Sequence, residues 1–108
     1  MVAKIERDLA SERRDDDERR ARVLPLVRAA VVEARRTGLC GDAWLFGSYA
    51  WGDTRPESDV EVLADRCADP IMLAVHIGRA TETEVHVIAL DKAPAELRER
   101  VLRDGVPL

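Results

Sequence analysis

A Gly-Ser pair is followed, after ten residues, by two acids one residue apart, and this is the most informative stretch of the chain. Gly47-Ser48 closes the apolar run 43–46, and Asp59 and Glu61 stand at the start of a second apolar run. Glycine permits a tight turn and a close approach of the backbone to a phosphate group. Backbone N–H groups at a helix start bind phosphate oxygens. Two carboxylates one residue apart on a strand point to the same face, where they can hold a hard divalent cation against a triphosphate.

The apolar pattern predicts a small α/β fold of the α+β kind, with a short mixed sheet packed against helices. Apolar residues recur at helical spacing after Pro25, which we expect to lie in the first turn of a helix. Short apolar runs between turn residues predict three strands, and Pro70 and Pro94 each favour a helix start. The predicted ranges are helices over 25–36, 70–79 and 94–104, strands over 43–46, 59–63 and 83–90, and a helical turn over 49–51.

The chain has 108 residues, enough for one domain with one core. We divide it into a charged N-terminal helix or arm over residues 1–24 and a folded domain over residues 25–108. Charged residues crowd the first 22 positions and apolar residues are few there, which is typical of a solvated helix face. The alternative is that this arm docks onto a partner.

The net charge of −4 is unevenly distributed. Residues 37–108 carry seven Lys/Arg and thirteen Asp/Glu, whereas residues 1–36 carry ten and eight. An acidic body repels a nucleic-acid backbone. We therefore expect a nucleotide with its metal ion, or a protein, as the binding partner, and we do not expect nucleic acid.

Location and redox state follow from what the sequence lacks. No apolar run is long enough to cross a membrane, and the first residues lack the apolar core of a signal peptide, so we expect a cytoplasmic protein without membrane contact. Cys40 and Cys67 have no metal-ligand spacing around them. We expect two reduced thiols.

Residues 25–108 resemble the minimal nucleotidyltransferases, the smallest single-domain members of the polymerase-beta-like superfamily. The resemblance rests on the Gly-Ser and acid-x-acid elements lying between two strands, and on the C-terminal segment 85–108. Many such proteins are the antitoxin of a toxin–antitoxin module whose toxin is a helical HEPN-type ribonuclease. The resemblance implies Mg²⁺ as the metal, ATP as substrate, and transfer of AMP to a tyrosine hydroxyl of the toxin, with pyrophosphate leaving.

The same resemblance assigns the site residues. Gly47 and Ser48 would bind the triphosphate, and Asp59 and Glu61 would bind Mg²⁺. In the family a third carboxylate comes from the next strand, and the matching position here is His86. The candidate catalytic set is therefore Asp59, Glu61 and His86.

Two of these residues depart from the family pattern. Glu61 stands where the family usually has aspartate, and its extra methylene moves the oxygens further than octahedral Mg²⁺ readily tolerates. His86 supplies no negative charge, and imidazole is a poor Mg²⁺ ligand. Glu84 lies two residues earlier on the same strand face and is a candidate substitute.

Two classes of function are open, with a third behind them. The chain is either an enzyme that adenylylates its toxin or a binding module that has kept the fold, lost catalysis and neutralises the toxin by covering it. Tyr49 and Trp51 are candidates for exposed contact residues. The altered carboxylate set favours the binding module more than an ordinary family member would. The third function, transfer to a small molecule such as an aminoglycoside, normally needs a second domain for the acceptor.

Overall fold

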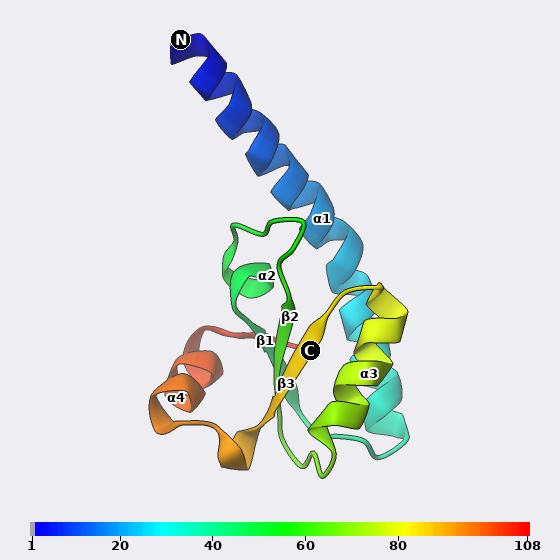
Figure 1. Cartoon of the computed structure of the whole chain (residues 1–108). Coiled ribbons are helices and arrows are strands. Elements are labelled where there is room, and N and C mark those ends of the chain that lie inside the picture. The colour runs from blue at the N-terminus through cyan, green and yellow to red at the C-terminus, as the bar shows by residue number, and fades with distance from the viewer. Residues whose placement is uncertain (1) are drawn as a thin grey trace.

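The computed structural model describes the backbone of residues 2–108 and the side chains of residues 9–108 (Figure 1). The predicted α+β architecture is confirmed: a mixed four-stranded sheet packs against helices. In chain order the elements are α1 (Val2–Arg36), β1 (Ala43–Phe46), α2 (Ser48–Trp51), β2 (Val60–Ala64), α3 (Pro70–Thr81), β3 (Val85–Ala89), the 3-10 helix η1 (Leu90–Lys92), α4 (Ala95–Asp104) and β4 (Val106–Pro107).

The strand order is β3-β2-β1-β4, so β1 and β2 are the central strands. β1 runs antiparallel to both of its neighbours, and β2 runs parallel to β3. Parallel neighbours need a long crossover connection, and α3 supplies it. The register places Glu61 of β2 between Phe46 of β1 and His86 of β3. The C-terminal end of β1 and the N-terminal ends of β2 and β3 therefore meet at the same end of the sheet.

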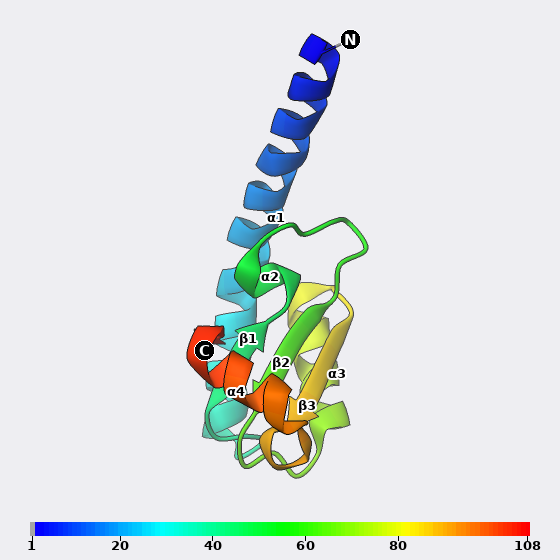
Figure 2. The same cartoon turned by 90° about the vertical axis from the view of Figure 1, so that its left-hand side faces the viewer.

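Helices cover the two faces of the sheet unequally. The C-terminal part of α1 and all of α3 lie on one face, and α2 and α4 lie on the other (Figures 1 and 2). The larger core fills the first face and includes Val27, Val31, Leu45, Val62, Leu73 and Ile77. A smaller core of Phe46, Leu63, Ala93 and Val101 lies under α4. Strand residues that alternate between the two cores fix the register, since a slip by one residue would exchange the faces.

We had predicted that Pro25 lies in the first turn of a helix. This prediction is wrong, because Pro25 lies inside α1. Proline removes one backbone hydrogen bond and its ring crowds the preceding turn. The helix nevertheless continues, because Val23 and Val27 on either side of Pro25 are both buried in the larger core. Tertiary packing here outweighs the local preference, and the expected boundary between residues 24 and 25 falls within one helix.

The other differences from the predicted elements are small. β2 starts at Val60 instead of Asp59, and β3 is shorter than predicted. β4 was missed, because two residues that include Pro107 carry little strand signal. Proline is compatible with an edge strand, and β4 pairs only through Trp44 and Leu45 of β1. Among the residues that the structure describes, no helix is both long and apolar enough to span a membrane.

Candidate functional site

The Gly-Ser turn lies where β1 ends and α2 begins. Gly47 has φ of 76°, in the left-handed region that favours glycine. Its carbonyl accepts hydrogen bonds from the N–H groups of Ala50 (3.0 Å) and Trp51 (2.9 Å), which forms the single turn of α2. The predicted strand, turn and helical turn are thus present. A four-residue helix offers only a small dipole to an anion, so the turn by itself is a weak phosphate site.

The acidic residues and His86 share one face of β2 and β3. The parallel register pairs Val60 with Val85 and Glu61 with His86, and it continues upstream through a hydrogen bond from the Val60 N–H to the Glu84 carbonyl (2.9 Å). Since alternate residues point to the same face, Asp59, Glu61, Glu84 and His86 all lie on the face that carries α2 and α4. The sequence-predicted catalytic residues are therefore neighbours.

Glu61 turns away from its strand neighbour His86 and toward β1. A Cβ atom at residue 47 would overlap Glu61 Oε2, so the carboxylate lies directly over the bare Cα of Gly47. We had predicted from the sequence that a phosphate would approach the Gly-Ser turn through this space. A carboxylate there repels an anionic ligand, and it fills the space that glycine would otherwise leave open.

Asp59, Glu84 and His86 converge on a different point of the same face. His86 Nε2 lies 3.1 Å from Asp59 Oδ2 and 3.7 Å from Glu84 Oε1. One ligand atom from each residue lies within 4.8 Å of the other two. Asp59 and His86, both predicted, are joined here by Glu84, whereas Glu61 is not part of this group.

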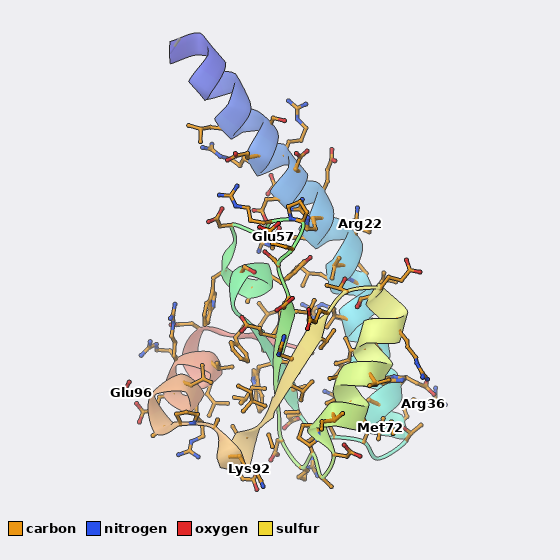
Figure 3. The ribbon with its side chains drawn as sticks, viewed as in Figure 1. Arg22, Arg36, Glu57, Met72, Lys92 and Glu96 are labelled. Carbon is orange, nitrogen blue, oxygen red and sulfur yellow. The ribbon has the colours of Figure 1, made fainter. Side chains whose placement is uncertain are left out.

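An open pocket of about 680 Å³ adjoins this group at the edge of the sheet. Its lining includes Arg19 and Arg22 of α1 together with Glu57, Asp59 and Glu84. Figure 3 shows Arg22 on α1 and Glu57 on the loop before β2 at the same end of the sheet. The pocket thus contains both cations and carboxylates, a combination that suits an anionic ligand only if a cation first offsets the acids.

A buried acid in the N-terminal helix holds the loop that carries Asp59, and the sequence analysis missed it. The Asp16 carboxylate accepts hydrogen bonds from the Thr54 N–H (2.8 Å), the Asp53 N–H (3.3 Å) and the Thr54 hydroxyl. The Thr54 hydroxyl is the main reason why the pKa of Asp16 is lowered. Asp16 is 9% exposed and Val23, seven residues later, is 3% exposed. That seven-residue step onto the core face was the available signal.

Tyr49 and Trp51 do not form an exposed pair. The prediction of an exposed Tyr49 is wrong: its side chain is 2% exposed, and burial raises the pKa of its hydroxyl. Helical spacing had not distinguished the inner from the outer side of a single turn. Trp51 is 38% exposed, but its side chain already contacts other parts of the fold. Its indole N–H donates to the Asp104 carbonyl (2.9 Å), and the Arg100 guanidinium lies 4.1 Å from its ring centroid.

The remaining histidine and the cysteines have structural surroundings. His76, on α3, contacts the Ala30 carbonyl at 3.0 Å through Nε2, as expected of a histidine at the edge of a core. Cys40 is buried and Cys67 is half-buried, and neither forms a disulfide. Burial raises the pKa of both thiols, which makes them less reactive.

The donor set does not fit Mg²⁺. Mg²⁺ requires near-ideal octahedral coordination by oxygen ligands and keeps several waters. The group that converges here contains an imidazole, and the second acid of the Asp59-x-Glu61 pair faces Gly47 instead. An all-oxygen site of the family type is therefore not assembled by these residues.

Comparison with known proteins places the fold in one class. No family model matches the chain, and no curated protein is significantly similar to it in sequence. Among solved structures, a protein designated a minimal nucleotidyltransferase has a TM-score of 0.61 and 25% identity, and the match covers 76% of this chain and 88% of the other. The chain therefore has the minimal nucleotidyltransferase fold.

Two further structures with this fold are of toxin–antitoxin systems. One was solved with AMP-PNP (TM-score 0.60, 23% identity, 73% of this chain and 69% of the other). The other is a mutant of the toxin–antitoxin pair MntA-HpeT (TM-score 0.58, 24% identity, 71% of this chain and 68% of the other). At these identities the likeness concerns the fold.

Proposed function

We propose that this protein is an antitoxin with a nucleotidyltransferase fold, which neutralises a HEPN-type ribonuclease toxin by binding it directly. The fold, together with its likeness to toxin–antitoxin structures, supports the antitoxin role. The observation that carries the choice of binding over catalysis is the placement of Glu61 over Gly47. A phosphate that approaches the Gly-Ser turn would meet the Glu61 carboxylate, and histidine stands at the position of the family's third acid.

The second candidate function is adenylylation of the toxin with Mg²⁺ and ATP. In that reaction a tyrosine oxygen of the toxin attacks the α-phosphorus of ATP, and the bond to pyrophosphate breaks. The open pocket beside Asp59, with Arg19 and Arg22 on its wall, favours retention of some nucleotide affinity. We expect this affinity to be weak, because Glu61 and the absence of a third acid both act against a bound Mg²⁺–ATP complex.

The projecting part of α1 is the proposed contact surface for the toxin. It extends beyond the sheet (Figure 1), and Leu9 on it is 52% exposed. A charged helix that packs on little of its own domain is suited to pack along a helical partner. The alternative contact surface is the outer side of α3, where Ile71 and Met72 are exposed. Unchanged toxin binding after truncation of α1 would favour this surface.

A rescue assay with mass spectrometry distinguishes the two functions. The toxin, encoded beside this chain or supplied from a relative, is expressed with the wild type or with Asp59→Ala. We expect both to relieve growth arrest and to co-purify with a toxin whose mass is unchanged. If Asp59→Ala fails to rescue, and the wild type adds the mass of AMP to the toxin, the protein acts as an enzyme.

A further inference from the structure

We infer that Asp59, Glu84 and His86 form a binding site for a divalent first-row transition-metal ion that accepts imidazole, such as Zn²⁺ or Cu²⁺. The three side chains come from the starts of two parallel strands, and their positions are fixed by the register of β2 and β3. The site uses Glu84 in place of Glu61, so it is displaced along the strands from the pair that the sequence motif indicates.

The spacing of the donor atoms fits a single small ion. With metal–ligand distances near 2.0–2.2 Å, adjacent ligand atoms lie roughly 3.0–3.4 Å apart. His86 Nε2 is 3.1 Å from Asp59 Oδ2 and 3.7 Å from Glu84 Oε1. The Glu84 oxygen must move closer to the other two atoms, from which it now lies within 4.8 Å, to complete the set. That side chain is 74% exposed and has the freedom to make this movement.

The donor types select the class of ion. Two carboxylates supply negative charge, and the imidazole nitrogen favours Zn²⁺ and neighbouring transition metals over Mg²⁺ and Ca²⁺. Three protein ligands leave coordination positions open, which distinguishes this set from a closed structural zinc site. Asp59 and Glu84 also line the pocket that contains Arg22, from which an anion could complete the coordination.

Metal binding requires no partner protein. The metal site can therefore be absent while the protein still acts as an antitoxin, and the metal can bind even if no toxin does. The test is a competition titration of the purified chain with Zn²⁺ against a chromophoric chelator. We expect one ion per chain. Loss of even an outer-shell partner costs about 10–100-fold in metal affinity, so His86→Ala and Glu84→Gln should each lower the affinity by at least about tenfold.

Matched variants distinguish this set of ligands from general attraction by acids. Glu61→Gln removes a charge from the same sheet face, and Glu57→Gln removes one from the adjoining loop. We expect each to lower Zn²⁺ affinity less than Glu84→Gln does. Circular dichroism of every variant confirms that the fold is intact. If Glu61→Gln weakens binding as much as His86→Ala, or if His86→Ala binds as tightly as the wild type, the inference is wrong.

Paramagnetic NMR gives a readout that does not depend on affinity. The chain has two histidines, and His76 lies on α3 against the Ala30 carbonyl. Substoichiometric Cu²⁺, which is paramagnetic and accepts imidazole, should broaden the imidazole signals of His86 before those of His76. Equal broadening of the two histidines, or none at equimolar Cu²⁺, would contradict the site.

Discussion

At the scale of single residues, Glu61 differs from the expected aspartate by one methylene group. Glutamate at position 61 reaches far enough to place its carboxylate over the bare Cα of Gly47. Gly47 is then constrained twice, by its positive φ and by the oxygen that occupies the space of a Cβ. If the Gly-Ser turn binds phosphate as we predict, the Glu61 carboxylate would obstruct it.

Substitution of Gly47 by alanine should reveal this contact. The positive φ alone should cost about 1–3 kcal/mol, and the overlap with Glu61 adds to it. In a Glu61→Ala background the overlap with the Glu61 carboxylate is removed and only the cost of the positive φ remains. A double-mutant cycle, with stability measured by urea unfolding, should therefore give an interaction energy of about 0.5 kcal/mol or more. Additive effects of the two substitutions would show that Glu61 does not lie over Gly47 in solution.

At the scale of elements, α1 serves as the support for the loop that leads to Asp59. Asp16 binds the backbone and hydroxyl of Thr54, and Arg19 donates to the Thr54 carbonyl at 3.0 Å. Arg20 donates to the Tyr49 carbonyl at 3.3 Å. From residue 16 onward the charged N-terminal region is therefore part of the folded domain, because it holds the loop between α2 and β2.

Asp16→Ala should destabilise the protein, because it leaves the N–H groups of the loop without their acceptor. Hydrogen bonds to a charged group contribute about 1.5–3 kcal/mol, and we expect a loss in this range from urea unfolding. Asp15→Ala and Asp17→Ala are matched controls, since both neighbours are exposed. An equal loss in the three variants would indicate a general charge effect on the helix.

The contribution of Asp16 should depend on pH. Its native pKa lies below the ordinary value of 3.8, chiefly because the Thr54 hydroxyl donates to the ionised form. The unfolded chain therefore binds the proton more readily, and the stabilisation is present above pH 3.8 and lost as pH falls through the lower native pKa. The difference in unfolding free energy between wild type and Asp16→Ala should shrink across that window. A constant difference down to pH 2 would rule out this linkage.

Local sequence signals predicted the elements well where one pattern dominates. Strands β1 and β2 and helices α3 and α4 follow from apolar periodicity and from Pro70 and Pro94. Pro25 misled because packing on either side of it overrides its local preference, and β4 is too short to carry a pattern. The candidate site residues lie together, as the motif predicts, but the direction in which Glu61 turns depends on contacts across strands.

At the scale of the whole molecule, an acidic domain carries a projecting helix. The principal dimensions are 53 × 29 × 18 Å, and the long axis follows α1 (Figure 1). We had expected a solvated charged helix or arm over residues 1–24, but Asp16 and Arg20 contact the loop and α2. A truncation that removes the arm must therefore stop before residue 12, since Glu12 pairs with Arg55 at 3.2 Å.

Deletion of residues 1–11 should separate partner binding from folding. The deletion spares the ion pair of Glu12 and the contacts of Asp16. We therefore expect the free energy of unfolding, measured in urea, to change by less than about 0.5 kcal/mol, as for other surface changes. Affinity for the toxin, measured by calorimetry, should fall by at least about tenfold, or 1.4 kcal/mol. Unchanged affinity would assign the contact to another surface, such as the outer side of α3.

We propose that this protein binds a toxin partner and that its altered site opposes nucleotidyl transfer. The most direct test incubates labelled ATP, Mg²⁺ and the toxin with the wild type, with Asp59→Ala, and with the double variant Glu61→Asp/His86→Asp. We predict that the wild type transfers no more label than Asp59→Ala does, and that the double variant, with its acids restored, transfers more. Vigorous labelling by the wild type that Asp59→Ala abolishes would contradict the claim.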